Sequence, residues 1–322
     1  MGDRPNDGRA RSKVRGIVIS HPDREVYPGT GIRKKDVVAY YDAVMDWFLP
    51  GIIERPIPAL RCPEGVGVNR FFQKRATGGL RHIGSLKLAE RDGRVRHYIY
   101  PADARSIIEL VQFDTLEFHA WGCKIQDTTR ADRVVFDMDP GADVAWSRVV
   151  TAARLLRQRL EALNLASFVL ATGGNGLHVV VPLNPAVAWD VVKDFAGAFA
   201  AMMAAARPEE FIAVPMLSQR RGRIYVDYLR NSRGATSVVP YSLRARRGAP
   251  VVVPLRWSEL GKLAGPGAHD LHAALQRLRR LRSDPWEGMD TIHQSLKDAL
   301  ETLPGMQGFN RDRSNGIEPY GG

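Results

Sequence analysis

Hydrophobic positions recur at different spacings in the two halves of the chain. In "KKDVVAYYDAVMDWFLPG" they return three or four residues apart, which predicts a packed helix over residues 34–51 that ends at Pro50-Gly51. Short extended runs broken by glycine and proline follow, then a helix near residues 103–111 and a strand in "TLEFHAWG". We therefore expect a small sheet with one or two helices in this half.

Strand and helix patterns alternate in the second half. They predict strands at 133–138, 167–171, 177–183 and 222–229 and helices at 144–161 and 186–205, with Asn184 as the cap of the second helix and Pro185 as its first residue. A strand near 237–241 and helical segments around 268–281 and 289–302 follow. The order β-α-β-β-α-β is typical of the split βαβ, ferredoxin-like arrangement, an α+β fold in which helices cover one face of an antiparallel sheet. The other face is free to carry a site.

Both ends of the chain are polar and contain glycine and proline. Residues 1–13 and 304–322 are therefore expected to be disordered tails. The remainder divides into an N-terminal part, 14–130, and a part that carries the candidate chemistry, 131–303.

An excess of positive charge indicates the kind of partner. The 322 residues carry a formal net charge of +11, with a pI near 9.9. Between Arg220 and Arg247, eight arginines surround a single acid, Asp227. Such an excess suits a polyanion, so nucleic acid is favoured over the alternative of a merely soluble basic protein.

The sequence contains no run of about eighteen apolar residues and no hydrophobic segment after its N-terminal charges. We therefore expect a cytoplasmic protein without a membrane partner. Cys62 and Cys123 lack metal-type spacing and are interpreted as packing residues.

Two carboxylates end the apolar run "RVVFDMDPG", residues 133–141. Because side chains alternate along a strand, Asp137 and Asp139 point to one face, where two like charges are costly unless a cation lies between them. The alternative is an Asp-Pro-Gly turn that merely ends the strand. Asp227 also ends an apolar strand, and it is either a third ligand beside this pair or a surface acid among arginines. Three carboxylates at one sheet edge would suit two Mg²⁺ or Mn²⁺ ions that promote phosphoryl displacement.

A glycine-rich turn, "ATGGNGLHVVVPL", lies between two predicted strands at residues 171–183. Its glycines let backbone amides turn toward an anion, and Thr172 and His178 add groups that bind phosphate oxygens. The alternatives are a simple Asn-Gly hairpin turn and a satisfied core histidine. Arg220, Arg230 and Arg244 suit a triphosphate, or else form a solvated basic face.

These motifs, together with "HPDREVYPGTGIRKKDVVAYY", "NRFFQK", "VDYLRNSRGATSVVPYSLRAR" and "VPLRWSEL", resemble the polymerase domain of bacterial DNA ligase D. That domain belongs to the archaeo-eukaryotic primase superfamily and acts in non-homologous end joining. The resemblance extends from about His21 to about Trp286, with the motifs in the family's order. It implies a primase-like fold with a ferredoxin- or RRM-like catalytic sheet, helices packed against it, and an N-terminal α/β subdomain.

The resemblance also implies roles for single residues. The catalytic and metal-binding acids would be Asp137, Asp139 and Asp227. The nucleotide-binding residues would be Thr172, Asn175, His178, Arg230, Arg244 and His119; the template-binding pair would be Phe71 and Phe72; and the DNA 5′-phosphate-binding pair would be Arg24 and Lys34. Two positions depart from the family pattern: Asn175 replaces a frequent lysine or arginine, and Arg24 replaces a frequent lysine.

The implied enzyme is a DNA-directed nucleotidyltransferase that extends 3′ ends at gaps and double-strand breaks with a downstream 5′-phosphate. It would use two Mn²⁺ or Mg²⁺ ions and would prefer ribonucleotides, ATP and GTP among them. The implied partners are DNA ends and gapped DNA, the Ku protein, and the ligase and nuclease domains of ligase D, fused or supplied separately. The implied location is the bacterial cytoplasm, at the nucleoid.

Two other functions share parts of this pattern. A metal-dependent nuclease also needs clustered carboxylates and basic DNA contacts, but it does not need a histidine, an arginine and a glycine turn that hold a triphosphate. A non-catalytic module that bridges DNA ends would need only the basic surface.

Overall fold

The computed structural model describes residues 13–76, 78–90 and 93–303. Of the two predicted tails, residues 1–12 and 304–322 lie outside this description, whereas Lys13 begins the first strand. The helices of the described residues are α1 (Lys34–Ala43), α2 (Met45–Ile52), α3 (Ala104–Gln112), α4 (Trp146–Glu161), α5 (Trp189–Ala206), α6 (Leu271–Leu278), α7 (Lys297–Thr302), and the 3-10 turns Leu217–Gln219, Leu260–Lys262 and Met289–Thr291.

The strands of the described residues form one large sheet, one smaller sheet and three hairpins. The large sheet has the order β13 (Phe211–Ile212), β14 (Ile224–Asp227), β10 (Arg130–Pro140), β12 (Leu177–Ala188), β11 (Phe168–Ala171) and β16 (Val253–Leu255). The smaller sheet has the order β15 (Thr236–Val238), β9 (Thr115–Trp121), β5 (Ala59–Arg61) and β6 (Phe71–Gln73). The hairpins are β1 (Lys13–Val14) with β2 (Ile17–Val18), β3 (Glu25–Tyr27) with β4 (Ile32–Arg33), and β7 (Ile83–Ala89) with β8 (Val95–Pro101).

The large sheet contains the predicted ferredoxin-like core. Along the chain, β10, α4, β11, β12, α5 and β14 follow the order β-α-β-β-α-β. The sheet places β14, β10, β12 and β11 side by side, each antiparallel to its neighbour. The prediction is therefore confirmed, with β13 added at one edge and β16 at the other.

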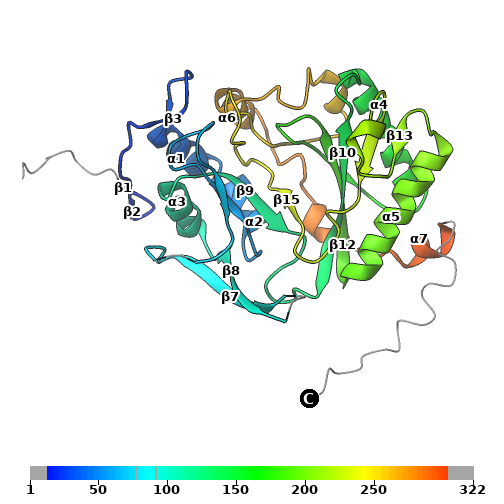
Figure 1. The fold of residues 1–322 in the computed structure, drawn as a ribbon, viewed down its shortest axis with the longest axis horizontal. Helices are drawn as coiled ribbons and strands as arrows, with labels where there is room; N and C mark the ends of the chain where they lie inside the picture. Colours follow the sequence, from blue (N-terminus) through cyan, green and yellow to red (C-terminus); the bar gives the residue numbers. More distant parts are fainter. Residues whose placement is uncertain (1–12, 77, 91–92, 304–322) are drawn as a thin grey trace, which may run out of the picture.

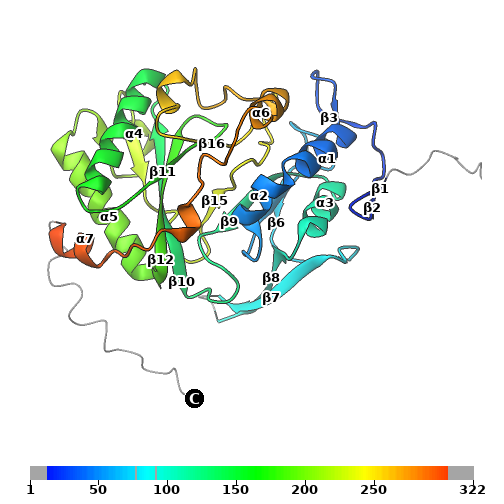
Figure 2. The ribbon, with the colours of Figure 1, turned by 180° about the vertical axis from the view of Figure 1, so that it is seen from behind.

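Helices α4 and α5 cover only one face of this sheet, as both Figure 1 and Figure 2 show. The alternation of side chains along β10 explains the arrangement, because Phe136 packs on Phe199 of α5 with ring centroids 5.0 Å apart. Asp137, the next residue, must therefore point to the opposite face. That face looks toward the N-terminal half of the molecule (Figure 1).

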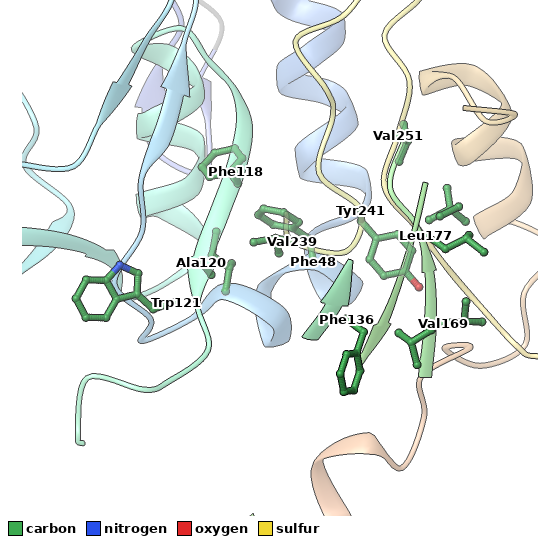
Figure 3. Packing of buried hydrophobic residues seen from close by; sticks show 14 of the residues in the cluster. Phe48, Phe118, Ala120, Trp121, Phe136, Val169, Leu177, Val239, Tyr241 and Val251 are labelled. Atoms are coloured by element: carbon green, nitrogen blue, oxygen red, sulfur yellow. The ribbon is translucent and has the colours of Figure 1, made fainter. Parts of the chain in front are cut away.

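The N-terminal half is joined to the large sheet by a shared core. Strand β15 follows β14 in the chain but pairs with β9 of the smaller sheet. Figure 3 shows the buried side chains running from Phe118 on β9 through Phe48 and Tyr241 to Leu177 on the large sheet. The predicted parts 14–130 and 131–303 share one hydrophobic core, so their division into separate units stays a prediction.

Several element boundaries differ from the sequence-based expectation. The helix predicted over 34–51 is broken at Val44 and continues past Pro50 to Ile52. Pro50 has no N–H to donate to the carbonyl of Asp46. Both residues are exposed, so this carbonyl can bind water instead and the helix tolerates the proline. The segment predicted as a helix over 289–302 is a 3-10 turn and the short α7.

The start of α5 was also predicted wrongly. Asn184 and Pro185 do not cap the helix, which begins at Trp189, but lie within β12. The reason is tertiary: Val187 and Ala188 still pair with the beginning of β10, so the chain stays extended until this ladder ends.

Cys62 and Cys123 are both buried as free thiols, which confirms their interpretation as packing residues. Burial raises the pKa of the Cys62 thiol to about 11 and that of Cys123 to about 12, so both are protonated at neutral pH. Among the described helices, none is both long and apolar enough to cross a membrane.

Candidate active site

Three sequence motifs meet on the open face of the large sheet. Asp137 in β10 is the register partner of His178 in β12 on one side and of Asp227 in β14 on the other. Directly opposed residues of neighbouring strands point to the same face, and Asp139, two residues further along β10, points there as well. The predicted adjacency of the three aspartates is thus confirmed by strand order and register.

Asp137 is the most buried of the three acids and lies against an arginine and a histidine. Its Oδ2 lies 2.6 Å from Arg230 Nε, 2.5 Å from Arg230 Nη2 and 3.4 Å from His178 Nε2. Burial by itself would raise the pKa of this carboxyl, but His178 and Arg230 lower it well below its usual range. Asp137 is therefore an anion at any working pH.

Asp139 has the opposite electrostatic character. Burial and the charge of Asp137 raise the pKa of Asp139, although Arg220 lies with Nη1 3.3 Å from its Oδ2. Arg230 also reaches Asp227, with Nε 3.8 Å from Oδ2. Two arginines therefore offset the charge of three carboxylates, and the offset is least complete at Asp139.

The donor set fits a hard divalent cation, because carboxylate oxygens are the ligands that Mg²⁺ and Mn²⁺ prefer. Burial and, after it, the neighbouring charge of Asp137 raise the pKa of Asp139, and a cation beside these two carboxylates would oppose both effects. Within the described part of the chain, however, no three His, Cys, Asp or Glu side chains converge on one point. A cation between Asp137 and Asp227 requires the Arg230 guanidinium, which contacts both, to move.

The glycine-rich turn carries the predicted phosphate-binding residues. Thr172 Oγ1 donates to the carbonyl of Gly176 at 2.9 Å and accepts the N–H of Gly174 at 3.2 Å, so the hydroxyl closes the turn locally. A Cβ at Gly176 would lie 2.0 Å from the carbonyl oxygen of Met138, so this position needs glycine for β12 to approach β10. The predicted hairpin turn and the candidate anion site therefore occupy the same segment.

Two arginines from residues 244–246 flank this turn. Arg244 Nη1 donates to the carbonyl of Thr172, and Arg246 Nη1 donates to Asn175 Oδ1 at 3.3 Å. Asn175, the position that departs from the family pattern, therefore has a guanidinium beside it. The positive charge missing from the turn is present on the neighbouring segment.

His178 is not a satisfied core histidine. It is buried, its Nε2 faces Asp137, and its Nδ1 has no hydrogen-bond partner among the described residues. Such an unpaired buried nitrogen is costly in a purely structural role. The finding favours the ligand interpretation, which stays a prediction.

His119 belongs to a second charged group, on β9. Its Nε2 lies 2.7 Å from Glu117 Oε1, while Glu117 Oε2 accepts the N–H of Ala245 at 2.9 Å and lies 3.0 Å from Arg244 Nε. Burial would raise the pKa of Glu117, but His119 and Arg244 lower it to about 2. Burial lowers the pKa of His119, against the opposing charge of Glu117.

The predicted template pair lies next to this group. Phe71 and Phe72 on β6 are about half exposed, at 47% and 49%, which is unusual for phenylalanine and leaves both rings able to stack. Phe72 meets the His119 ring edge-on at 5.4 Å, and Arg61 lies over Phe71 at 5.3 Å. The pair therefore borders the predicted nucleotide site.

Arg24 and Lys34 form a separate cluster. Both pair with Asp114, Lys34 Nζ at 3.2 Å, and Lys34 Nζ also donates to the carbonyl of Gln112 at 2.6 Å. Burial lowers the pKa of Lys34, against the opposing effect of Asp114. The structure thus brings the two predicted 5′-phosphate ligands together, away from the three aspartates.

Besides Arg246, the sequence analysis missed Asn231 and Glu117 as residues of the site. Asn231 is buried and fixes the turn after β14 to β10, since its Oδ1 accepts the N–H of Val135 at 2.7 Å and its Nδ2 donates to the carbonyl of Val135 at 2.8 Å. Glu117 had a usable signal, because the alternation in "LEFHAWG" places it on the same strand face as His119. Asn231 had none.

Comparisons with known proteins identify relatives of this site and fold. A sequence model of the LigD primase-polymerase domain matches residues 33–286. The chain is 37% identical over 295 residues to the multifunctional non-homologous end joining protein LigD of Pseudomonas aeruginosa, covering 91% of this chain and 35% of that protein. It is 26% identical over 259 residues to the bifunctional LigD of Bacillus subtilis, covering 80% of this chain and 42% of that protein.

A solved structure agrees. The polymerase domain from Mycobacterium tuberculosis ligase D in complex with DNA superposes with a TM-score of 0.79 at 28% identity, covering 86% of this chain and 99% of that chain. The predicted primase-like α+β fold is therefore confirmed. The chain spans less than half of the length of the two curated relatives.

Proposed function

The chain belongs to the family of LigD primase-polymerase domains, and from this premise we propose that it adds nucleotides to DNA 3′ ends in non-homologous end joining. One observation carries the proposal: Asp227 and His178 flank Asp137 in register on the free face of the β-α-β-β-α-β sheet. Clustered carboxylates beside a glycine-rich turn flanked by two arginines suit nucleotidyl transfer.

The chemistry divides among the residues of this face. Asp137, Asp139 and Asp227 would hold the Mn²⁺ or Mg²⁺ ions, and such ions would supply Lewis-acid stabilisation of the negative charge on the phosphates and on the primer 3′-oxygen. His178 and Arg244 bind the triphosphate oxygens beside the glycine-rich turn. Thr172, Asn175, Arg230 and His119 complete the nucleotide site.

The DNA is held by the N-terminal half. Phe71 and Phe72 stack on template bases, a mode of contact that tolerates any sequence. Arg24 and Lys34 bind the 5′-phosphate on the far side of a gap as a pair of cations.

We also propose a preference for ribonucleotides and a place at the nucleoid in the bacterial cytoplasm. The further partners are the Ku protein and the ligase and nuclease activities of ligase D.

The proposal is tested with 5′-labelled gapped DNA that carries a downstream 5′-phosphate, incubated with Mn²⁺ and either ribonucleotides or deoxyribonucleotides. We expect the primer to lengthen only when nucleotide is present, and faster with ribonucleotides. Shortening without nucleotide would identify the nuclease instead. Bridging of DNA ends without any change of length would identify the non-catalytic module.

Arg246 supplies the charge that Asn175 lacks, and its removal should weaken nucleotide binding. We expect Arg246→Ala to raise KM for the nucleotide by about threefold to tenfold with little change in kcat, because an exposed charged contact contributes modestly. Steady-state gap filling measures both constants. Arg247→Ala removes an exposed neighbouring guanidinium and is the matched control. Equal constants for the two variants would contradict the role of Arg246.

A further inference from the structure

We propose that Glu117 is a positioning residue that sets the tautomer of His119 and the place of the Arg244 guanidinium at the nucleotide site. The proposal rests on the proposed function, since that function makes His119 and Arg244 nucleotide ligands. Glu117 itself is set back from the site, because it is only 5% exposed in the middle of β9.

The two oxygens of Glu117 serve different partners. Oε1 faces His119 Nε2 at 2.7 Å on the same strand. Oε2 faces the next segment, where it accepts the N–H of Ala245 at 2.9 Å and pairs with Arg244 Nε at 3.0 Å. One carboxylate therefore connects β9 with the segment that follows β15.

The contact with Glu117 determines which nitrogen of His119 carries the proton. The pKa of Glu117, about 2, leaves the carboxylate ionised and able only to accept hydrogen bonds. His119 Nε2 must therefore be the donor. Because burial lowers the pKa of His119, the ring is neutral at neutral pH and Nδ1 keeps its lone pair. Glu117 thus presents His119 as a hydrogen-bond acceptor at Nδ1.

The same carboxylate restrains Arg244. The guanidinium lies between Glu117, which forms an ion pair with Nε without hydrogen-bond geometry, and the carbonyl of Thr172, which accepts from Nη1. An arginine held at both places loses little further side-chain freedom when it binds phosphate, so binding is stronger than with a mobile side chain. Loss of the Glu117 charge would release Arg244 on one side.

The Glu117→Gln variant tests whether Glu117 acts on His119 and Arg244 through its two oxygens and not only by packing, because glutamine has one oxygen and one NH₂ group. If the amide oxygen accepts from Ala245 and faces Arg244, the NH₂ group faces His119 Nε2. That nitrogen must then accept, and the ring proton moves to Nδ1. The reverse orientation sets the NH₂ group against two donors and is disfavoured. The variant is therefore expected to switch the tautomer.

The tautomer is read from long-range ¹H–¹⁵N spectra of ¹⁵N-histidine protein without DNA or nucleotide, with the His119 signals assigned from a His119→Gln variant. We expect the proton on Nε2 in the wild-type protein and on Nδ1 in Glu117→Gln. In gap filling, Glu117→Gln should lower kcat/KM for the nucleotide about 10- to 100-fold, chiefly through KM, as observed when residues that orient a ligand are changed.

Glu259→Gln is the matched control. Glu259 also pairs with an arginine, Arg277 Nη1 at 2.7 Å, and accepts a backbone N–H, that of Arg256 at 2.7 Å, but no histidine of the described residues is hydrogen-bonded to it. We expect this variant to keep the His119 tautomer and to change kcat/KM by less than about twofold.

Two results would overturn the proposal: a wild-type His119 protonated on Nδ1, or a folded Glu117→Gln protein with wild-type KM. The first result is measured on the wild-type protein, so the proposal can be tested even if the Glu117→Gln variant does not fold. Failure of the proposed function is a different result, since the wild-type protein would then not extend gapped DNA although its His119 tautomer was as expected.

Discussion

Asp137→Asn is expected to abolish nucleotide addition on gapped DNA, with a loss of about 1,000-fold or more in kcat. Asparagine keeps the size of the side chain but removes the charge at the centre of the site, where Asp137 lies between His178 and Asp227. Arg230 would then lose its closest anionic partner, and the face would become more positive where cations must bind. Extension of a labelled primer with Mn²⁺ and ribonucleotides measures the loss.

DNA binding by the same variant should be close to that of the wild-type protein, because the basic and aromatic DNA contacts are on other elements. Asp190→Asn, an exposed acid in the first turn of α5 on the covered side of the sheet, is the control and should retain full activity. Circular dichroism checks that both variants are folded. Substantial synthesis by folded Asp137→Asn would refute the assignment of the acids.

Removal of divalent cations should stop nucleotide addition completely. Three carboxylates share one sheet face, where burial and the charge of Asp137 raise the pKa of Asp139, and a divalent cation would stabilise the ionised carboxylates. We expect no extension in EDTA and recovery when Mn²⁺ or Mg²⁺ is added in excess. Electron paramagnetic resonance of free Mn²⁺ measures binding directly, without reference to activity.

The same measurement of Mn²⁺ binding tests which aspartates are metal ligands. Asp139→Asn should weaken Mn²⁺ binding by about tenfold or more, because it removes a carboxylate ligand. Asp190→Asn again serves as the control and should bind Mn²⁺ as the wild-type protein does. Equal Mn²⁺ affinity in the two variants, or extension that continues in EDTA, would show that these acids do not form a metal site.

The sequence by itself determined the local features of the fold. The hydrophobic periods located α4, β11 and the ferredoxin-like order, and the alternation along β10 placed Asp137 and Asp139 on one face. These features follow from the fixed geometry of helix and strand, in which side chains two or four residues apart share a face. The motifs "VVFDMDPG" and "TGGNGLHVVVPL", together with four further stretches of the sequence, also indicated the family, which the comparisons confirmed.

Element boundaries depended on partners that are distant in the chain. The sequence favoured a helix from residue 186 because Asn184 and Pro185 are good starting residues. The structure continues β12 to Ala188, since this strand still has a neighbour in β10. A hydrogen-bonded ladder to a distant strand therefore outweighed a local helix signal.

Only the tertiary structure decided the register and the contacts through which distant residues meet. Asp227 lies opposite Asp137 because β14 pairs with β10 in one register, and Glu117 reaches Arg244 because β9 lies beside the segment after β15. Arg246 meets Asn175 for the same kind of reason. Register and contact between distant segments are set by the packing of the whole core, a sum over many contacts that no local spacing encodes.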